Sequence, residues 1–95
     1  MKQYFVVSLC KNGVLGGGIV ADETAITYRT GKVTVPKEYR ALQMNYREIA
    51  GAAAGRKFGF PIVDITLTDG RQYRFLVFAQ KRFLTLLRQQ GVAVV

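Results

Sequence analysis

The sequence contains few side chains that perform acid–base, nucleophilic or metal chemistry. It has no histidine, the commonest general base and a frequent metal ligand. Its single cysteine, Cys10, has no partner for a catalytic dyad, a zinc site or an internal disulfide, so we expect a buried, small apolar residue there. Ser8 lies in an apolar run, and the six acidic residues include no pair suited to acid–base catalysis. We therefore expect no enzymatic activity, no cofactor and no metal.

Three consecutive glycines, Gly16-Gly17-Gly18, suggest a phosphate-binding loop at first sight. Such a loop leads into a helix whose N-terminus faces the phosphate, and the Walker form adds a lysine. Here Ile19-Val20-Ala21 continues as a strand-like apolar run. We expect a bent or bulged strand, or a place where another chain packs closely.

The basic residues are the remaining candidates for binding. Lysine and arginine number 14 against six acidic residues, and the net charge of +8 implies attraction to nucleic acid, anionic lipid or acidic proteins. No basic run exceeds two residues, which is also typical of a solubilising surface. The candidate contacts for a ligand or partner are Lys11, Arg29, Lys32, Lys37, Arg40, Arg56 and Lys57.

Aromatic side chains accompany several of these cations. Two groupings combine cations with aromatic residues: Tyr28, Arg29, Lys32, Lys37, Tyr39 and Arg40, and Arg56, Lys57, Phe58 and Phe60. A third grouping, Lys81, Arg82 and Arg88, contains no aromatic residue but shares one face of the predicted helix. Aromatic rings beside cations suit single-stranded nucleic acid. No RNP-like or GxxG motif supports that use, and a solvated charged face is the alternative.

The elements that must position these residues are mostly strands. Residues 62–78 read as a hairpin, because apolar residues alternate on both sides of Asp69-Gly70. A three-residue loop, 68–70, places Val63 opposite Phe75 and Ile65 opposite Tyr73, so that the apolar faces agree. We predict a type I turn with Gly70 in the left-handed region at a bulge.

Five more strands are predicted before the hairpin, at residues 2–10, 14–21, 24–30, 41–46 and 49–58. Both faces of residues 2–10 are largely apolar, which favours a strand that is central or covered on both sides. Residues 49–58 contain alanines that favour a helix and two glycines that oppose it, and we choose a strand. Residues 11–13, 22–23 and 59–61 are predicted turns or loops, and 32–40 a surface loop with Pro36 that could contain a short edge strand.

A helix is predicted over residues 79–90. Its apolar side chains fall within one arc of roughly 160°, and Gly91 suits the left-handed position that ends a helix. The arc contains Ala79, Phe83, Leu84, Leu86 and Leu87. Residues 92–95 are apolar and could form a tail or a small extra contact.

The chain is long enough for one domain, residues 1–95, and Met1 favours a natural start. No apolar run approaches the roughly 20 residues that span a bilayer. Residues 4–10 lack an A-x-A cleavage pattern, and one cysteine gives no sign of secretion, so the cytoplasm is expected.

This order of elements resembles the pleckstrin-homology (PH) superfold, closest to its small bacterial and GRAM-like members. The resemblance spans nearly the whole chain and rests on residues 18–28, 44–49, 65–70 and 73–75 with the terminal helix. It implies a mainly β (α+β) fold, a bent barrel of about seven antiparallel strands capped by one C-terminal helix. Phosphoinositide-binding members use a lysine near the end of strand one and Lys/Arg-x-Arg on strand two. Lys11 matches the first position, but residues 14–20 contain no cation.

The expected function is therefore that of a non-catalytic interaction module. The resemblance to bacterial members implies protein binding, with self-association as the leading form and a homo-oligomer as the product. The alternative is an anionic ligand, either an acidic lipid surface or single-stranded nucleic acid, bound through the scattered cations.

Overall fold

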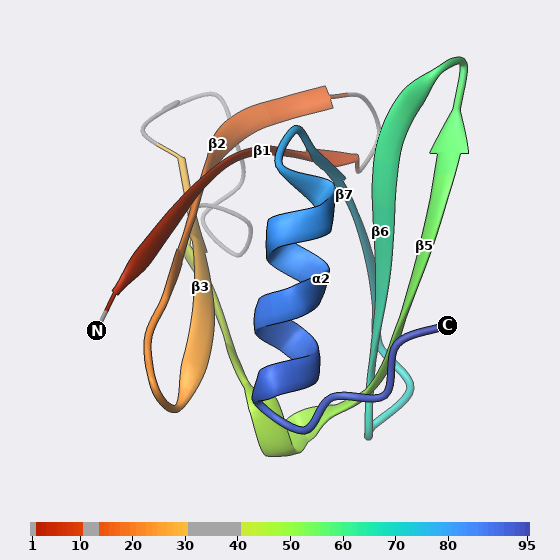
Figure 1. Cartoon of the computed structure of the whole chain (residues 1–95). Helices are drawn as coiled ribbons and strands as arrows, with labels where there is room; N and C mark the ends of the chain where they lie inside the picture. The colour runs from red at the N-terminus through yellow and green to blue at the C-terminus, as the bar shows by residue number, and fades with distance from the viewer. Residues whose placement is uncertain (1, 11–13, 31–40) are drawn as a thin grey trace.

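The computed structural model describes residues 2–10, 14–30 and 41–95. These residues form β1 (Gln3–Cys10), β2 (Val14–Ala21), β3 (Ala25–Arg29), β4 (Ala41–Asn45), the 3₁₀ turn η1 (Tyr46–Glu48), β5 (Ile49–Lys57), β6 (Phe60–Leu67), β7 (Gln72–Val77) and the helix α2 (Gln80–Gln89). The seven strands make one antiparallel sheet in the order β4-β3-β2-β1-β7-β6-β5. The sheet curls into a half-barrel with α2 lying in its hollow (Figure 1). The predicted fold class is confirmed.

The core lies between the concave face of the sheet and α2. Strand alternation turns Phe5, Val7 and Leu9 of β1 inward, where all three are buried. The apolar arc of the helix meets them as predicted, because Phe83, Leu84, Leu86 and Leu87 are buried. The ring of Phe83 meets that of Phe5 edge-on, with centroids 5.0 Å apart. Gly91 follows the helix with φ +85°, as its position predicted.

The hairpin of β6 and β7 has the predicted register. Val63 lies opposite Phe75 and Ile65 opposite Tyr73. The loop spans three residues, since the backbone N–H of Leu67 donates to the carbonyl of Arg71 (2.8 Å). Gly70 has φ +94°. Because the loop contains an odd number of residues, the buried side chains of β6 lie opposite buried or half-buried side chains of β7 on the same face of the sheet.

Several predicted boundaries were wrong. Residues 59–61 are no loop: the turn is Phe58-Gly59, and Phe60 and Pro61 belong to β6. The pairing of β6 with β7 ends at Ile62 opposite Leu76, so Pro61 lies just beyond that ladder, where its missing N–H is tolerated. Tyr46 begins η1 and does not end β4. The predicted turn at 11–13 and the loop at 32–40 lie outside the described residues.

The glycine run lies within β2 and packs closely against β3. A Cβ built on Gly17 would lie 2.3 Å from the carbonyl oxygen of Arg29, so a side chain there would collide with the neighbouring backbone. The hydroxyl groups of Tyr28 and Thr30 donate to the carbonyls of Leu15 (2.6 Å) and Gly16 (2.8 Å). The pairing of β2 with β1 and β3 continues without a bulge, and the close approach at Gly17 is made by this chain's own neighbouring strand, whereas the prediction named another chain.

The segment after the helix returns to the sheet. Val92 is buried, and Val94 pairs in parallel with Ala52 of β5. The backbone N–H of Ala52 donates to the carbonyl of Ala93 (2.9 Å), and that of Val95 donates to the carbonyl of Ala52 (2.9 Å). The extra contact predicted for residues 92–95 thus covers part of the β5 edge (Figure 1). Within the described segments, no helix is long and apolar enough to cross a membrane.

Candidate interaction surface

The convex face of the sheet exposes apolar side chains that alternate with the core residues. Tyr4 is 66% exposed and Val6 is 70% exposed, on the side of β1 opposite Phe5 and Val7. The helix covers only the concave side (Figure 1). β1 is central in the sheet, as predicted, but among the described residues no second layer covers its outer face.

The exposed apolar residues of β1 continue onto both neighbouring strands. Tyr4 lies opposite Val20 of β2, and Ser8 lies opposite Leu76 of β7; Val20 and Leu76 are half-buried. Phe78, directly after β7, is 60% exposed. We define the outer apolar face as the side chains of Tyr4, Val6, Val20, Leu76 and Phe78.

A shallow groove lies beside β1 on this face. Its volume is about 310 Å³, and its lining includes Tyr4, Val6, Gly18, Val20 and Arg29. Gly18 leaves the floor low because it carries no side chain. The outer apolar face therefore has a ridge, formed by Tyr4 and Val6, directly next to a groove.

A second exposed feature is the tip of the hairpin that joins β5 to β6. Lys57 pairs with Phe60, so Phe58 and Gly59 form a two-residue turn. Both have positive φ, +53° for Phe58 and +82° for Gly59, which is the pattern of a type I′ turn. The ring of Phe58 is 90% exposed, and Phe60 is exposed as well. The guanidinium Nη1 of Arg56 donates to the carbonyl of Gly59 (3.2 Å).

A hollow of about 370 Å³ separates this tip from the β1–β2 end of the sheet. Its lining is largely apolar: Cys10, Val14, Lys57, Phe58, Ile62, Arg74 and Leu76. Cys10 is half-buried here, so the prediction of a buried residue was wrong. Its side chain alternates outward with the inward-facing Leu9. The guanidinium group of Arg74 donates two hydrogen bonds to the carboxylate of Asp64 (2.7 and 3.2 Å). The positive charge of Arg74 is therefore paired within the sheet.

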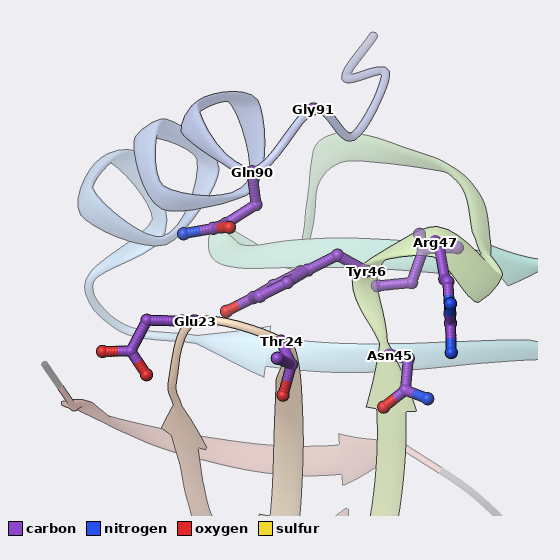
Figure 2. Close-up of a pocket in the computed structure, with 8 residues that line it drawn as sticks. Glu23, Thr24, Asn45, Tyr46, Arg47, Gln90 and Gly91 are labelled. Atoms are coloured by element: carbon purple, nitrogen blue, oxygen red, sulfur yellow. The ribbon is translucent and has the colours of Figure 1, made fainter.

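A larger, polar hollow lies at the other end of the barrel, below the end of the helix. It has a volume of about 720 Å³, and its lining includes Glu23, Thr24, Asn45, Tyr46, Arg47, Gln90 and Gly91. Figure 2 shows the ring of Tyr46 crossing it, with Glu23 and Arg47 on opposite sides. The two opposite charges do not converge on one point, so the hollow has no centre that favours an anion or a cation.

The hydroxyl group of Tyr46 fixes the β2–β3 turn. It donates to the carbonyl of Asp22 (2.7 Å), while the carboxylate of Asp22 accepts hydrogen bonds from the backbone N–H groups of Thr24 (2.8 Å) and Ala25 (2.9 Å). Burial and, to a lesser extent, the charge of Asp22 raise the pKa of Tyr46 to about 12. A phenol with this pKa stays protonated near neutral pH, so Tyr46 braces the turn and is a poor acid or base.

The predicted cationic positions do not gather in the described part of the chain. Arg29 lies at the end of β3, beside the groove, whereas Arg56 and Lys57 lie at the end of β5 near the hairpin tip. Lys11, Lys32, Lys37 and Arg40 lie outside the described residues. On the helix face, Arg82 donates to the carbonyl of Tyr4 (2.8 Å) and its guanidinium carbon lies 4.2 Å from the centroid of the Phe5 ring. That cation therefore ties α2 to β1.

Sequence reasoning missed the outer apolar face and the exposed tip. The signal for the first was present in β1, where both faces are apolar. The pattern could not say whether a second layer would cover the outer one. The signal for the exposed hairpin tip was the pair Phe58-Gly59, in which Phe58 was assigned to the end of a strand and Gly59 to the start of a loop.

Comparison with known proteins supports the fold and extends no further. No protein-family model and no curated protein sequence matches this chain. Its structure is similar to the crystal structure of the C-terminal domain of an unknown protein from Leishmania infantum, with a TM-score of 0.77 and 9% sequence identity. The match covers 93% of this chain and 80% of that one. At this identity the likeness shows a shared fold: a seven-stranded antiparallel half-barrel with a C-terminal helix.

Proposed function

We propose that this chain is a non-catalytic PH-like module of the cytoplasm that self-associates through its outer apolar face. The observation that carries the proposal is the convex side of β1, where Tyr4 and Val6 are exposed in the middle of the sheet. Large contiguous apolar patches on a protein surface mark contact sites for proteins or membranes. The half-barrel with its terminal helix agrees with a PH-like fold and supports the assignment to that superfold.

The shape of this face favours a second copy of the chain as the partner. A two-fold dimer places the same patch of both subunits together, so the patch must be complementary to itself. Here the ridge of Tyr4 and Val6 lies directly beside the groove floored by Gly18. Two copies related by a two-fold axis can each place the ridge in the other's groove.

The net charge predicts the direction in which salt changes self-association. Each copy carries +8, so two copies repel one another at low ionic strength. Added salt screens this repulsion, and self-association should strengthen as salt rises. Binding to an anionic ligand would weaken under the same change because it depends on attraction.

The experiment is light scattering coupled to size exclusion, at about 100 μM protein over a range of salt concentrations. We expect a dimer whose population grows with salt. Val6→Glu places a charge at the centre of the outer apolar face and should yield a monomer. Gln43→Glu adds the same charge at an exposed position on β4, outside the face, and should leave the dimer intact. A wild-type chain that stays strictly monomeric at all salt concentrations would refute self-association.

A further inference from the structure

The hairpin tip places a bulky aromatic residue where the backbone disfavours one. Both central residues of a type I′ turn need positive φ, which suits Asn-Gly or Gly-Gly. Phe58 occupies the first of these positions with φ +53°, in the left-handed region where a Cβ crowds the following carbonyl. Non-glycine residues held in this region are concentrated at functional sites, so an outlier of this kind points to a role outside the fold.

Packing does not explain the residue either. The ring of Phe58 is 90% exposed, so it contributes little to the core. The hairpin projects beyond the rest of the sheet, and its tip is the extreme point of the molecule at that corner (Figure 1). Phe60 is exposed on the same tip, and Val14 is exposed across the hollow that Val14 and Phe58 line together. Three apolar side chains therefore lie exposed at this corner.

Positive charge accompanies these apolar side chains. Arg56 and Lys57 directly precede Phe58, and both are exposed. Arg56 donates to the carbonyl of Gly59, which holds its charge beside the turn. A projecting aromatic ring flanked by cations matches the boundary of an anionic bilayer, where acyl chains lie below a layer of negative headgroups.

We propose that the Phe58 tip is a membrane-interface anchor, which inserts its aromatic ring below the headgroups of an anionic lipid surface while Arg56 and Lys57 remain among the phosphates. This inference does not depend on self-association, which uses the outer apolar face.

The small size of the tip favours a bilayer over a protein partner. A stable protein interface buries about 800 Å² on each partner, which a two-residue turn with its flanking side chains does not supply. A lipid surface deforms around a projecting side chain and needs no matching cavity. Its attraction to cations is worth about fivefold in affinity for each lysine or arginine near the surface.

The first test measures co-sedimentation with vesicles of phosphatidylcholine, with and without phosphatidylserine, at about 50 mM salt. We expect binding to the phosphatidylserine vesicles that falls as salt rises. Phe58→Asn keeps a residue suited to the turn and should weaken binding at least fivefold. Val95→Asn removes an exposed apolar side chain that lies outside both the tip and the outer apolar face, and it should change binding less than twofold.

The second test reports on insertion directly. The chain has no tryptophan, so Phe58→Trp introduces a single tryptophan at the tip, whose emission can be excited separately from that of the tyrosines. Its emission should shift to the blue when phosphatidylserine vesicles are added, whereas the emission of Val95→Trp, at an exposed position outside the tip and the outer apolar face, should not shift.

Three outcomes would overturn the proposal. The first is no binding of the wild-type chain to phosphatidylserine vesicles at low salt. The second is binding by Phe58→Asn equal to that of wild type. The third is an effect of Phe58→Asn on oligomeric state alone, which would assign the tip to a protein contact.

Discussion

Replacing Phe58 by asparagine should stabilise the fold, although it removes a large apolar side chain. The left-handed backbone costs a residue with an ordinary side chain about 1–2 kcal/mol, and asparagine largely escapes this cost. Full burial of a phenylalanine is worth about 1.5–3 kcal/mol, but Phe58 is 90% exposed, so its loss forfeits only a few tenths of a kcal/mol. The balance is a gain of about 1 kcal/mol, or about 4–8 °C in Tm for a domain of this size.

Thermal and urea unfolding followed by circular dichroism would measure the change. Gly59→Ala is the matched control at the next position, where φ is +82° and a Cβ would meet nothing within 4 Å. Because space is free there, backbone strain alone should destabilise that variant by about 1 kcal/mol. A Phe58→Asn variant that melts below wild type would refute the reasoning. It would mean that the ring stabilises the fold, and that the fold itself explains the residue.

Three further variants test the packing and the electrostatics. In urea unfolding, Gly17→Ala should destabilise the fold by about 1–3 kcal/mol, because its Cβ would meet the backbone of β3. The nearest atom to a Cβ on Gly18 is 3.4 Å away, so Gly18→Ala should change the stability by less than about 1 kcal/mol. Leu87→Ala, at a fully buried position of α2, should cost about 2–5 kcal/mol by the same measurement, whereas the exposed Thr85→Ala should cost little. Because folding raises the pKa of Tyr46 from 10.0 to about 12, its contribution to stability should be fully present below pH 10 and be lost as pH rises from 10 to 12. The free energy of unfolding should fall less steeply between pH 10 and 12 in Tyr46→Phe than in wild type. Equal slopes in the two proteins would contradict the raised pKa of Tyr46.

The parts of the fold that the sequence predicted are those set by local patterns. The register of β6 and β7 followed from alternation around Asp69-Gly70, because only one loop length aligns the apolar faces. The buried stripe of α2 followed from the spacing of its leucines. In β5, the two glycines argued against a helix and the alanines favoured one. The predicted strand is correct, since β5 runs from Ile49 to Lys57.

The parts that were missed depend on what lies beyond a local window. Alternation in β1 assigned Tyr4 and Val6 to one face, but only the whole fold shows that α2 covers the other. Pro61 was assigned to a loop, whereas it lies in β6 just beyond the last residue that pairs with β7, which no local pattern shows. Phe58-Gly59 is not among the usual turn pairs, so no local rule indicated it. The cations Arg56 and Lys57 were chosen for their charge, and their position beside an exposed ring came from the turn.

The pairing of Val94 with Ala52 limits how the sheet could grow. Strands at both ends of an open sheet would let copies add one after another into a fibre. Here the terminal segment already bonds Ala52 and Ala54 in the middle of β5, so among the described residues β4 is the edge that is open along its whole length. Joining two chains at that edge uses it in both of them. Assembly by backbone pairing would therefore stop at two copies, and a chain whose terminal segment is detached would lose this protection against polymerisation.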